Sequence, residues 1–311
     1  MFLKPGNKTR KACRGLLALL ALGLVTATLV PLIHTDQWWI RVFDFPRIQI
    51  ASLIVLTFAG YVALFFWRGL HLWEWVLAAA AGAALVWQAM LIVPYTPLHP
   101  LELPASQNKD DSDRISILIY NVRYDNDRVE PLLDVIRDKA PDVILLSEPT
   151  PWWHEQLQEL KDDYPYAVEQ PQNNHYGMLV YSKLELVNPE IRFLIEPAVP
   201  SVRTGVKLRS GTRITLYSVH PRPPGLKPPD KGEGTEDSDD REDSDVRDAE
   251  LLLIAREVEK IGEVPVIVAG DFNDVAWSGT TRLFQRIGGL LDPRVGRGLY
   301  NTYDTGNQLF R

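Results

Sequence analysis

The sequence predicts a mixed α/β domain that follows three membrane-spanning helices. Residues 1–97 contain three long apolar segments, and residues 94–113 are rich first in proline and then in polar residues. The remainder alternates short β-branched runs with longer amphipathic stretches. Such alternation of strand-type and helix-type patterns indicates a layered domain of helices and sheet. A chain of 311 residues has room for both regions.

The first region, 1–97, has the pattern of a membrane anchor. Its apolar segments at 16–33, 48–67 and 72–93 are each close to the ~20 residues that span a bilayer as a helix. Tryptophans cluster at the segment ends, as interfacial aromatics do, and Glu74 is placed to reach the interface. The basic N-terminus also suits a cleaved signal peptide, but two further spans follow it and no small-residue cleavage site is evident. The alternative, buried helices of a soluble domain, would leave no polar face to meet water.

Lysine and arginine residues near the segment ends set the expected orientation. With the N-terminus inside, the cytoplasmic side carries Lys4, Lys8, Arg10, Lys11, Arg14 and Arg68, and the outer side carries Arg41, Arg47, Lys109 and Arg114. The positive-inside rule then puts residues 94–311 of this multi-pass protein outside, in the periplasm if the protein lies in the inner membrane of a Gram-negative bacterium. The one cysteine, Cys13, permits no intrachain disulfide and fits either side of the membrane.

The net charge of −7 comes from one short run. Residues 230–245 hold nine acidic and two basic side chains, so the rest of the chain is balanced. Because no basic face is evident, tight sequence-independent binding to duplex DNA is not expected. The Pro-rich and then acidic stretch at about 223–245 is predicted to be a disordered surface insertion.

Residues 98–113 are expected to be a linker, and residues 114–311 the domain that carries the chemistry. The linker follows from its prolines and from the polar run SQNKDDSD. Asn126 or Asp127 is a candidate cap for the first helix of the domain. Strands are expected at 114–121, 142–147, 175–182, 202–208, 214–220 and 264–269, and helices at 126–139, 152–161 and 246–261.

Polar residues recur where the apolar strands of this domain end. Asn121, Glu148 and His220 each follow a strand, and Asp271 with Asn273 follows a fourth. Singly these are ordinary turn or surface residues. Together they predict a site, because the carboxyl ends of strands are where sites form in layered α/β folds.

These segments resemble the endonuclease/exonuclease/phosphatase superfamily, which has the DNase I-like fold. Gly270-Asp271-Phe272-Asn273 matches its GDFN signature, which is moderately specific alone. The other motifs follow in the family's order and make the set specific: LIYNVR with Asn121, LLSEP with Glu148, HYGMLVYS with His175, and YSVHPR with His220. The stretches GDFNDVAWS and LLDPRVGRGLYNTY look like a bacterial, membrane-anchored subgroup. The resemblance covers about 114–303 and implies a four-layer α/β/β/α sandwich.

The resemblance also implies roles for these residues in hydrolysis of a phosphoester. Glu148 would be the principal ligand of Mg²⁺ or Mn²⁺ and Asn121 would support the metal or the phosphate. Asp271 would orient or deprotonate the attacking water, and Asn273 would donate a hydrogen bond to a phosphoryl oxygen. His220 would do likewise or protonate the leaving oxygen, and His175 would lie at the pocket wall. Hard oxygen ligands suit these two metals better than zinc.

One departure from the family's pattern divides the hypotheses. Family members end with an Asp-His pair, and no Asp-His dipeptide follows Asn273 here, so the domain is expected to be C-terminally incomplete. The first hypothesis is a metal-dependent phosphodiesterase, nuclease or phosphatase tethered to the inner membrane. The second is a truncated or degenerate, inactive phosphoester-binding membrane protein. The expected partners are the bilayer and a phosphate ester, either nucleic acid or a phospholipid headgroup, and no protein partner is evident.

Overall fold

The computed structural model describes residues 7–33, 35–65, 71–106, 110–224, 244–300 and 302. The acidic insertion expected at about 223–245 lies almost wholly outside these residues. The chain forms two compact units. The first consists of 1–104 together with 291–311, and the second consists of 105–290.

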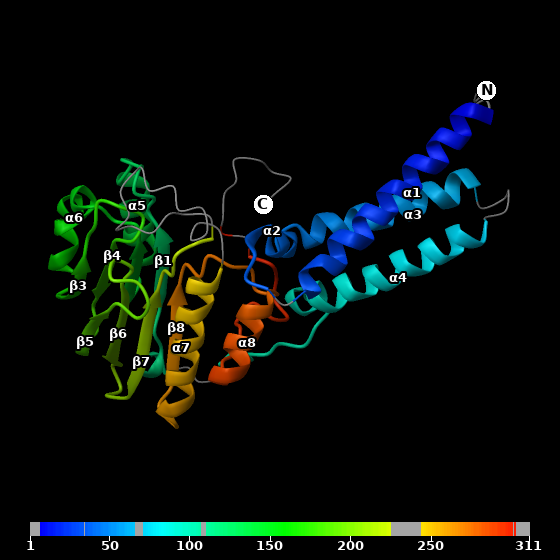
Figure 1. Ribbon diagram of the computed structural model, residues 1–311. Helices are drawn as coiled ribbons and strands as arrows, with labels where there is room; N and C mark the ends of the chain where they lie inside the picture. The colour runs from blue at the N-terminus through cyan, green and yellow to red at the C-terminus, as the bar shows by residue number, and fades with distance from the viewer. Residues whose placement is uncertain are drawn as a thin grey trace. The chain divides into compact units, whose positions relative to one another are not determined.

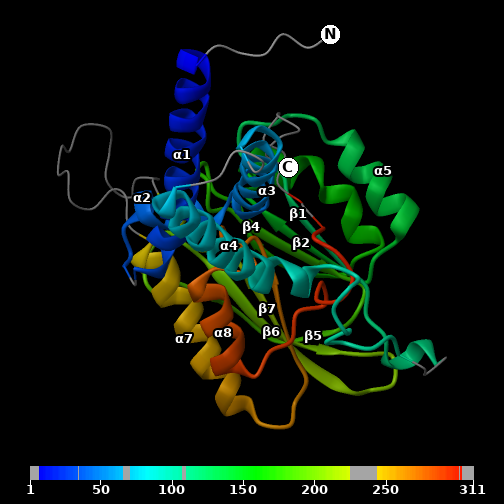
Figure 2. The same ribbon diagram turned by 90° about the vertical axis from the view of Figure 1, so that its right-hand side faces the viewer.

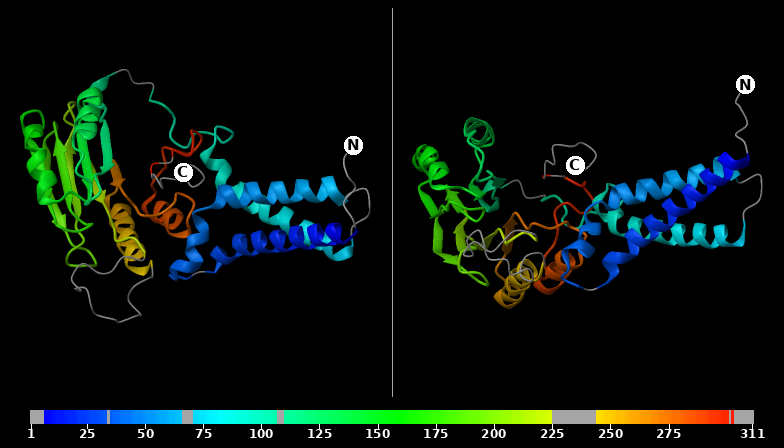
Figure 3. Two further views of the ribbon diagram at one scale, coloured as in Figure 1. Left: turned by 90° about the horizontal axis from the view of Figure 1, so that it is seen from above. Right: turned by 45° about the horizontal axis from the view of Figure 1, so that its top comes forward.

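The first unit is built on three long helices that run side by side, drawn in dark blue, blue and cyan in Figure 3. They are α1 (Asn7–Leu29), α3 (Arg47–Phe65) and α4 (Leu72–Ile92), and the short α2 (Trp38–Arg41) precedes α3. Small and branched side chains fill the space between them, so the helices approach closely. The buried members are Leu24, Val25, Ile50, Ile54, Ala81 and Ala84.

By length and hydropathy, two stretches of the described residues are able to cross a membrane. These are Lys11–Leu32 and Leu72–Tyr95. The helix pair Trp38–Asp44 and Arg47–Ala63 passes the same test together but is bent by 67°, so the number rises to three if that pair is one span.

The helix bundle buries charge as well as apolar side chains. Glu74, in the first turn of α4, is only 2% exposed and forms an ion pair with Arg14 of α1. On other turns Arg47 donates to Gln88 Oε1 at 3.0 Å, and Gln88 Nε2 donates to Thr28 Oγ1 at 3.1 Å. An unpaired charge in an apolar bundle is costly, which explains why these side chains meet across helices.

The second unit contains two four-stranded sheets in the described residues (Figure 1). Sheet A has the order β1-β2-β4-β3, from β1 (Ile117–Asn121), β2 (Val143–Ser147), β4 (Met178–Ser182) and β3 (Tyr166–Gln170). Sheet B has the order β5-β6-β7-β8, from β5 (Leu186–Arg192), β6 (Ser201–Lys207), β7 (Arg213–Val219) and β8 (Val266–Gly270). The pairs β1–β2 and β7–β8 are parallel, and the other pairs are antiparallel.

Apolar cores hold these sheets and helices in layers. Side chains such as Leu145, Val180 and Val206 fill the space between the sheets. Sheet A packs its other face on α5 (Glu130–Lys139) and α6 (Pro151–Gln156) through a core that includes Trp153. Sheet B packs its other face on α7 (Asp245–Ile261) and α8 (Gly279–Gly288) through a core that includes Phe284. Figure 2 shows α5 on one side of the strands and α7 with α8 on the other, an α/β architecture with two sheets.

Several elements differ from the sequence expectation. Strand β1 begins at Ile117 instead of residue 114, and α5 begins at Glu130 without a side-chain cap. Asn126 does not cap α5, because its side chain forms hydrogen bonds within the preceding loop. Its Nδ2 donates to Val122 O, and its Oδ1 accepts from Arg128 N. The sequence reading missed β3, β5 and α8. Strand β5 contains Pro189 and a register shift, features that are tolerated at a sheet edge and that hide the strand pattern.

Candidate active site

The register of the two parallel strand pairs brings four strand ends to one end of the sandwich. Asn121 pairs with Ser147, and Val219 pairs with Gly270. The next residues along the chain after Ser147, Val219 and Gly270 are Glu148, His220 and Asp271, so they leave their strands at matched levels. The contacts below show that the two sheets deliver these side chains to a single cluster.

Asn121 links the two sheets through its side-chain amide. Its Nδ2 donates to Glu148 Oε1 at 2.7 Å and to Asp271 Oδ2 at 3.1 Å. Its Oδ1 accepts from Arg123 N at 2.9 Å. Two carboxylates this close repel one another unless donors or a cation stand between them, and Asn121 supplies the donors.

His220 is a buried neighbour of both carboxylates. Its Nε2 is 3.9 Å from Glu148 Oε1 and 4.0 Å from Asp271 Oδ2, and the residue is 2% exposed. No described residue offers a hydrogen-bond partner to its Nδ1. Burial lowers the pKa of His220, while the charges of Asp271 and Glu148 act in the opposite direction. Burial therefore favours the neutral imidazole, which carries one donor and one acceptor nitrogen.

The ring of Tyr176 lies near the ring of His220. The two ring centroids are 6.3 Å apart, and the tyrosine is 2% exposed. Burial raises the pKa of Tyr176, so its phenol stays protonated. Its hydroxyl, like His220 Nδ1, has no hydrogen-bond partner among the described residues.

His175 lies at the more exposed side of the cluster. Its Nδ1 is 3.6 Å from Glu148 Oε2, and 36% of its side chain is exposed. The ring packs edge-on against Tyr124, with centroids 4.0 Å apart. The backbone N–H of Tyr124 also donates to Glu148 Oε2 at 3.3 Å. Both oxygens of Glu148 therefore face polar partners.

Asn273 joins the cluster through the loop that follows β8. Its backbone N–H donates to Asp271 Oδ1 at 3.0 Å, and its Nδ2 donates to Pro221 O at 2.9 Å. Its carbonyl accepts from Arg247 Nη1 at 2.8 Å. One hydrogen of the Asn273 side-chain amide thus bonds the loop after β7. The amide carries a second hydrogen, which this bond does not use.

Backbone strain gathers at this end of the sandwich. Arg123, Glu148 and Asn273 have φ of 58°, 64° and 51°, a left-handed region that non-glycine residues seldom adopt. Each of the three is a member of the cluster or bonds to one. Such strain persists only where the surroundings hold it, and it is typical of functional sites.

The six residues singled out from the sequence lie together through these contacts: Asn121, Glu148, His175, His220, Asp271 and Asn273. The sequence reading missed Tyr124, Tyr176 and Arg247. Tyr124 directly follows the motif LIYNVR and Tyr176 lies within HYGMLVYS, so nearness in the chain was an available signal. Arg247 stands 26 residues before Asn273 and gave no such signal.

The site has few groups able to hold a metal. Within the described residues, no set of three or more His, Cys, Asp and Glu side chains is arranged to hold an ion. The cluster offers carboxylate oxygens from Glu148 and Asp271, and Asn121 faces them with Nδ2 while its Oδ1 accepts from Arg123 N. That donor set fits Mg²⁺ or Mn²⁺, which are commonly held by one or two carboxylates and retained waters.

The comparison with protein families decides the family. A sequence model of the endonuclease/exonuclease/phosphatase family matches residues 118–311, which is more than half of the chain. The chain belongs to this family. The matched residues include the strand ends and loops that form the cluster. No curated protein matches the chain.

The solved structures that match the chain include three with the following identity, coverage and TM-score. A humanised D. rerio TDP2 is 21% identical over 57% of this chain and 67% of its own, with a TM-score of 0.42. The catalytic domain of human Nocturnin is 17% identical over 55% and 69%, with a TM-score of 0.41. Sphingomyelinase C from Streptomyces griseocarneus is 17% identical over 57% and 70%, with a TM-score of 0.40. The chain spans about two thirds of the length of these structures.

Proposed function

We propose that this chain is a metal-dependent phosphoester hydrolase tethered to a membrane. Membership of the endonuclease/exonuclease/phosphatase family supports hydrolysis of phosphoesters. The observation that carries the proposal is the meeting of Glu148 and Asp271, from different sheets, on one amide of Asn121. A fold has no structural need to bring two carboxylates together at the end of its strands, and the closeness supports a cation or a polarised substrate between them.

The metal in this proposal is Mg²⁺ or Mn²⁺, held by Glu148 with help from Asn121. When bound, such an ion offsets the negative charge of a phosphoester. To place its oxygen on the ion, the Asn121 amide would have to turn over and give up the bond from Arg123 N, a change that a bound cation would favour. Because so few protein ligands would hold the ion, it would keep several of its waters and its affinity would be modest.

The remaining residues act on the nucleophile and the phosphoryl oxygens. Asp271 accepts a hydrogen bond from the attacking water or takes its proton, because its Oδ2 faces the cluster. His220 presents Nε2 beside both carboxylates and donates to a phosphoryl or leaving oxygen. Asn273 gives its second amide hydrogen to a phosphoryl oxygen, and His175 with Tyr124 forms the exposed wall.

The test is hydrolysis of bis(p-nitrophenyl) phosphate by the full chain in detergent with Mn²⁺. Glu148→Gln keeps the shape and removes the charge, so we expect a loss of at least roughly 100-fold in kcat. The matched control is Glu155→Gln, an exposed carboxylate on α6, which should keep wild-type activity. Equal activity of wild type and Glu148→Gln would remove Glu148 from the site.

Calorimetric titration of the same proteins with Mn²⁺ separates binding from turnover. Wild type and Glu155→Gln should bind the ion, and Glu148→Gln should bind it at least roughly tenfold more weakly. Binding by wild type without turnover favours the alternative, an inactive phosphoester-binding protein. Identical binding by all three proteins contradicts the assignment of the ligand.

The cellular part of the proposal is a bacterial inner-membrane protein with a periplasmic catalytic domain. It combines an anchor at 1–97 with three spans, a linker at 98–113 and a hydrolase domain from 114 to 311. The apolar helices support membrane association, and the lysine and arginine bias supports the orientation. Alkaline phosphatase fused after Arg311 should be active in whole cells. An inactive phosphatase fusion alongside an active cytoplasmic reporter would reverse the orientation.

A further inference from the structure

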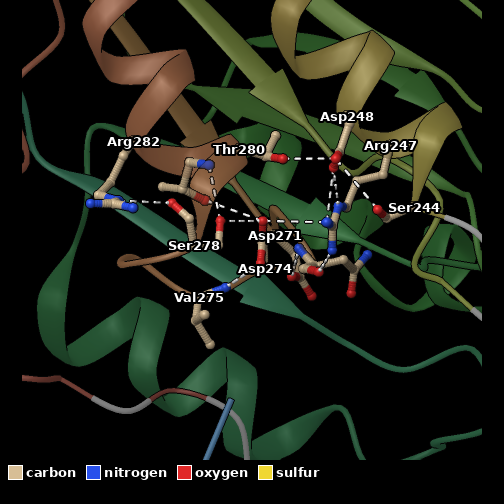
Figure 4. Close-up of polar contacts among 11 residues, drawn as sticks. Ser244, Arg247, Asp248, Asp271, Asp274, Val275, Ser278, Thr280 and Arg282 are labelled. Atoms are coloured by element: carbon tan, nitrogen blue, oxygen red, sulfur yellow. Dashed lines mark hydrogen bonds and ion pairs between the residues drawn. The ribbon is translucent and has the colours of Figure 1, made fainter. Parts of the chain in front are cut away.

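A buried guanidinium lies behind the loop that carries Asp271 and Asn273. Arg247 belongs to the first turn of α7 and is 2% exposed. Its Nη1 donates to Asn273 O at 2.8 Å, and its Nη2 is 3.4 Å from Asp274 Oδ2. Figure 4 shows the side chain lying between α7 and the loop, with Asp271 and Asp274 beside it.

The carboxylates around Arg247 are themselves fixed by hydroxyl groups. Arg247 Nε and Nη2 donate to Asp248 Oδ1 at 3.0 and 2.8 Å. Thr280 Oγ1 donates to Asp248 Oδ2 at 2.7 Å, and Ser278 Oγ donates to Asp274 Oδ2 at 2.6 Å. The guanidinium therefore has little freedom, because Asp248 of α7 and the loop hold its planar fork, and Ser278 and Thr280 at the start of α8 fix the two carboxylates.

A network of this kind is an expensive way to stabilise a fold. Buried charges lose hydration, and replacing such a network with apolar side chains is often neutral or stabilising. The guanidinium makes its contact with the loop at a strained residue, since Asn273 has φ of 51°. The same residue donates its N–H to Asp271 Oδ1 and its Nδ2 to Pro221 O. The carbonyl that Arg247 holds thus belongs to the residue that orients the Asp271 carboxylate.

We propose that Arg247 is a positioning residue for the hydrolytic reaction, acting through Asn273 and, by way of its backbone, on Asp271. The inference rests on the proposed function of this site. Arg247 touches neither substrate nor metal in this scheme. It holds the Asn273 carbonyl in place, so that the loop keeps the left-handed geometry in which both functional side chains face the cluster.

The kinetic test is a double-mutant cycle in the full chain. Arg247→Met should lower kcat by about 10- to 100-fold with little change in KM, because small misplacement of reacting groups is costly. Arg247→Lys keeps the charge without the fork and should recover part of the loss. Asn273→Ala keeps the carbonyl that Arg247 holds but removes the side-chain amide that this contact positions. In that background, Arg247→Met should therefore lower kcat by a factor at least about threefold smaller than it does in wild type. Full multiplication of the two effects would overturn the proposal.

A matched control separates positioning from general destabilisation. Arg192→Met removes another cation that pairs with a carboxylate of α7. That carboxylate, Glu257, lies near the C-terminal end of α7, whereas Arg247 lies in its first turn. It should lower the melting temperature by an amount comparable to Arg247→Met and leave kcat unchanged. If Arg192→Met lowers kcat as much as Arg247→Met does, the effect is one of stability and the proposal fails.

Hydrogen exchange gives a readout that does not depend on activity. In Arg247→Met, the amides of residues 271–274 should exchange at least roughly tenfold faster than in wild type, and those of β2 should not change. Arg192→Met should leave 271–274 unchanged. Unchanged exchange of these amides in Arg247→Met would contradict the proposal. Faster exchange in a chain that cleaves no phosphoester shows that Arg247 holds the loop but that the proposed function is wrong.

Discussion

The sheet A half and the sheet B half of the candidate site are held in place by different means. On sheet A, Glu148 N donates to Gly177 O at 2.9 Å, and Gln172 N donates to Pro149 O at 3.1 Å. On sheet B, the loop after β8 is held by the Arg247 side chain, which comes from a helix distant in sequence. Backbone groups therefore set the first half, and buried charges set the second.

This difference teaches how each half should respond to substitution. Backbone hydrogen bonds survive most side-chain changes, so the Glu148 loop depends mainly on whether neighbouring chains can approach. Side-chain charges are lost with one substitution, and a partner left behind in the interior is costly. The sheet B half should therefore be the more sensitive one, except at positions where the backbone itself is crowded.

The largest expected effect is a loss of stability at a crowded glycine, and it should occur in both halves of the site. A Cβ at Gly177 would lie 1.9 Å from Pro149 O, and one at Gly270 would lie 2.0 Å from Val219 O. Gly270 also has φ of 139°. Alanine at either position should lower the free energy of unfolding by about 3 kcal/mol or more, measured by denaturant unfolding. Gly279→Ala, with open space around it, should change stability by under about 0.5 kcal/mol.

A smaller effect should appear only on the sheet B side, at Glu250 of α7. This carboxyl is 2% exposed, and Oε1 has no hydrogen-bond partner among the described residues. Burial raises its pKa from 4.5 to about 8; the nearby charge of Glu196 adds to the rise, and Arg192 opposes it. Since the folded state binds the proton more tightly, the stabilising contribution is complete below about pH 4.5 and is lost as pH rises through 8.

Glu250→Gln removes this titration. Wild type should lose on the order of 2–4 kcal/mol of stability between pH 5 and pH 9, and the variant should lose clearly less over the same range. Urea unfolding of the full chain in detergent at each pH measures the difference. Glu155→Gln, an exposed carboxylate on α6, should follow the wild-type curve. Parallel curves for wild type and Glu250→Gln would contradict the assignment.

The smallest expected effect separates the two halves directly. Asp274→Asn leaves Arg247 with a weaker partner and should cost about 1–3 kcal/mol of stability and roughly tenfold in kcat. Gln172→Ala on the sheet A side keeps the backbone N–H that bonds Pro149 O and should cost under about 1 kcal/mol, with kcat unchanged. Equal losses in the two variants would show that both halves depend on side chains.

Much of the candidate site followed from local sequence. Asn121, Glu148, His220 and Asp271 stand immediately after or at the end of apolar strands, and parallel strands bring such ends together. Asn273 was predicted together with Asp271 after the same strand, and motif order then added His175. The resemblance of the motifs predicted the family and the two sheets, whereas strand and helix periodicities, which are local properties of the chain, predicted only a mixed α/β domain.

Tertiary structure decided the parts whose partners are distant in sequence. The pairing of Glu74 with Arg14 was not foreseen, because the apolar pattern shows a span but not which face meets a neighbour. Strand β5 was missed, because Pro189 at a sheet edge breaks the alternation that reveals a strand. Arg247 was read only as part of an amphipathic helix. Periodicity records which side of an element is buried, whereas the partner of a buried charge is set by folding, which brings Arg247 to a loop 26 residues away.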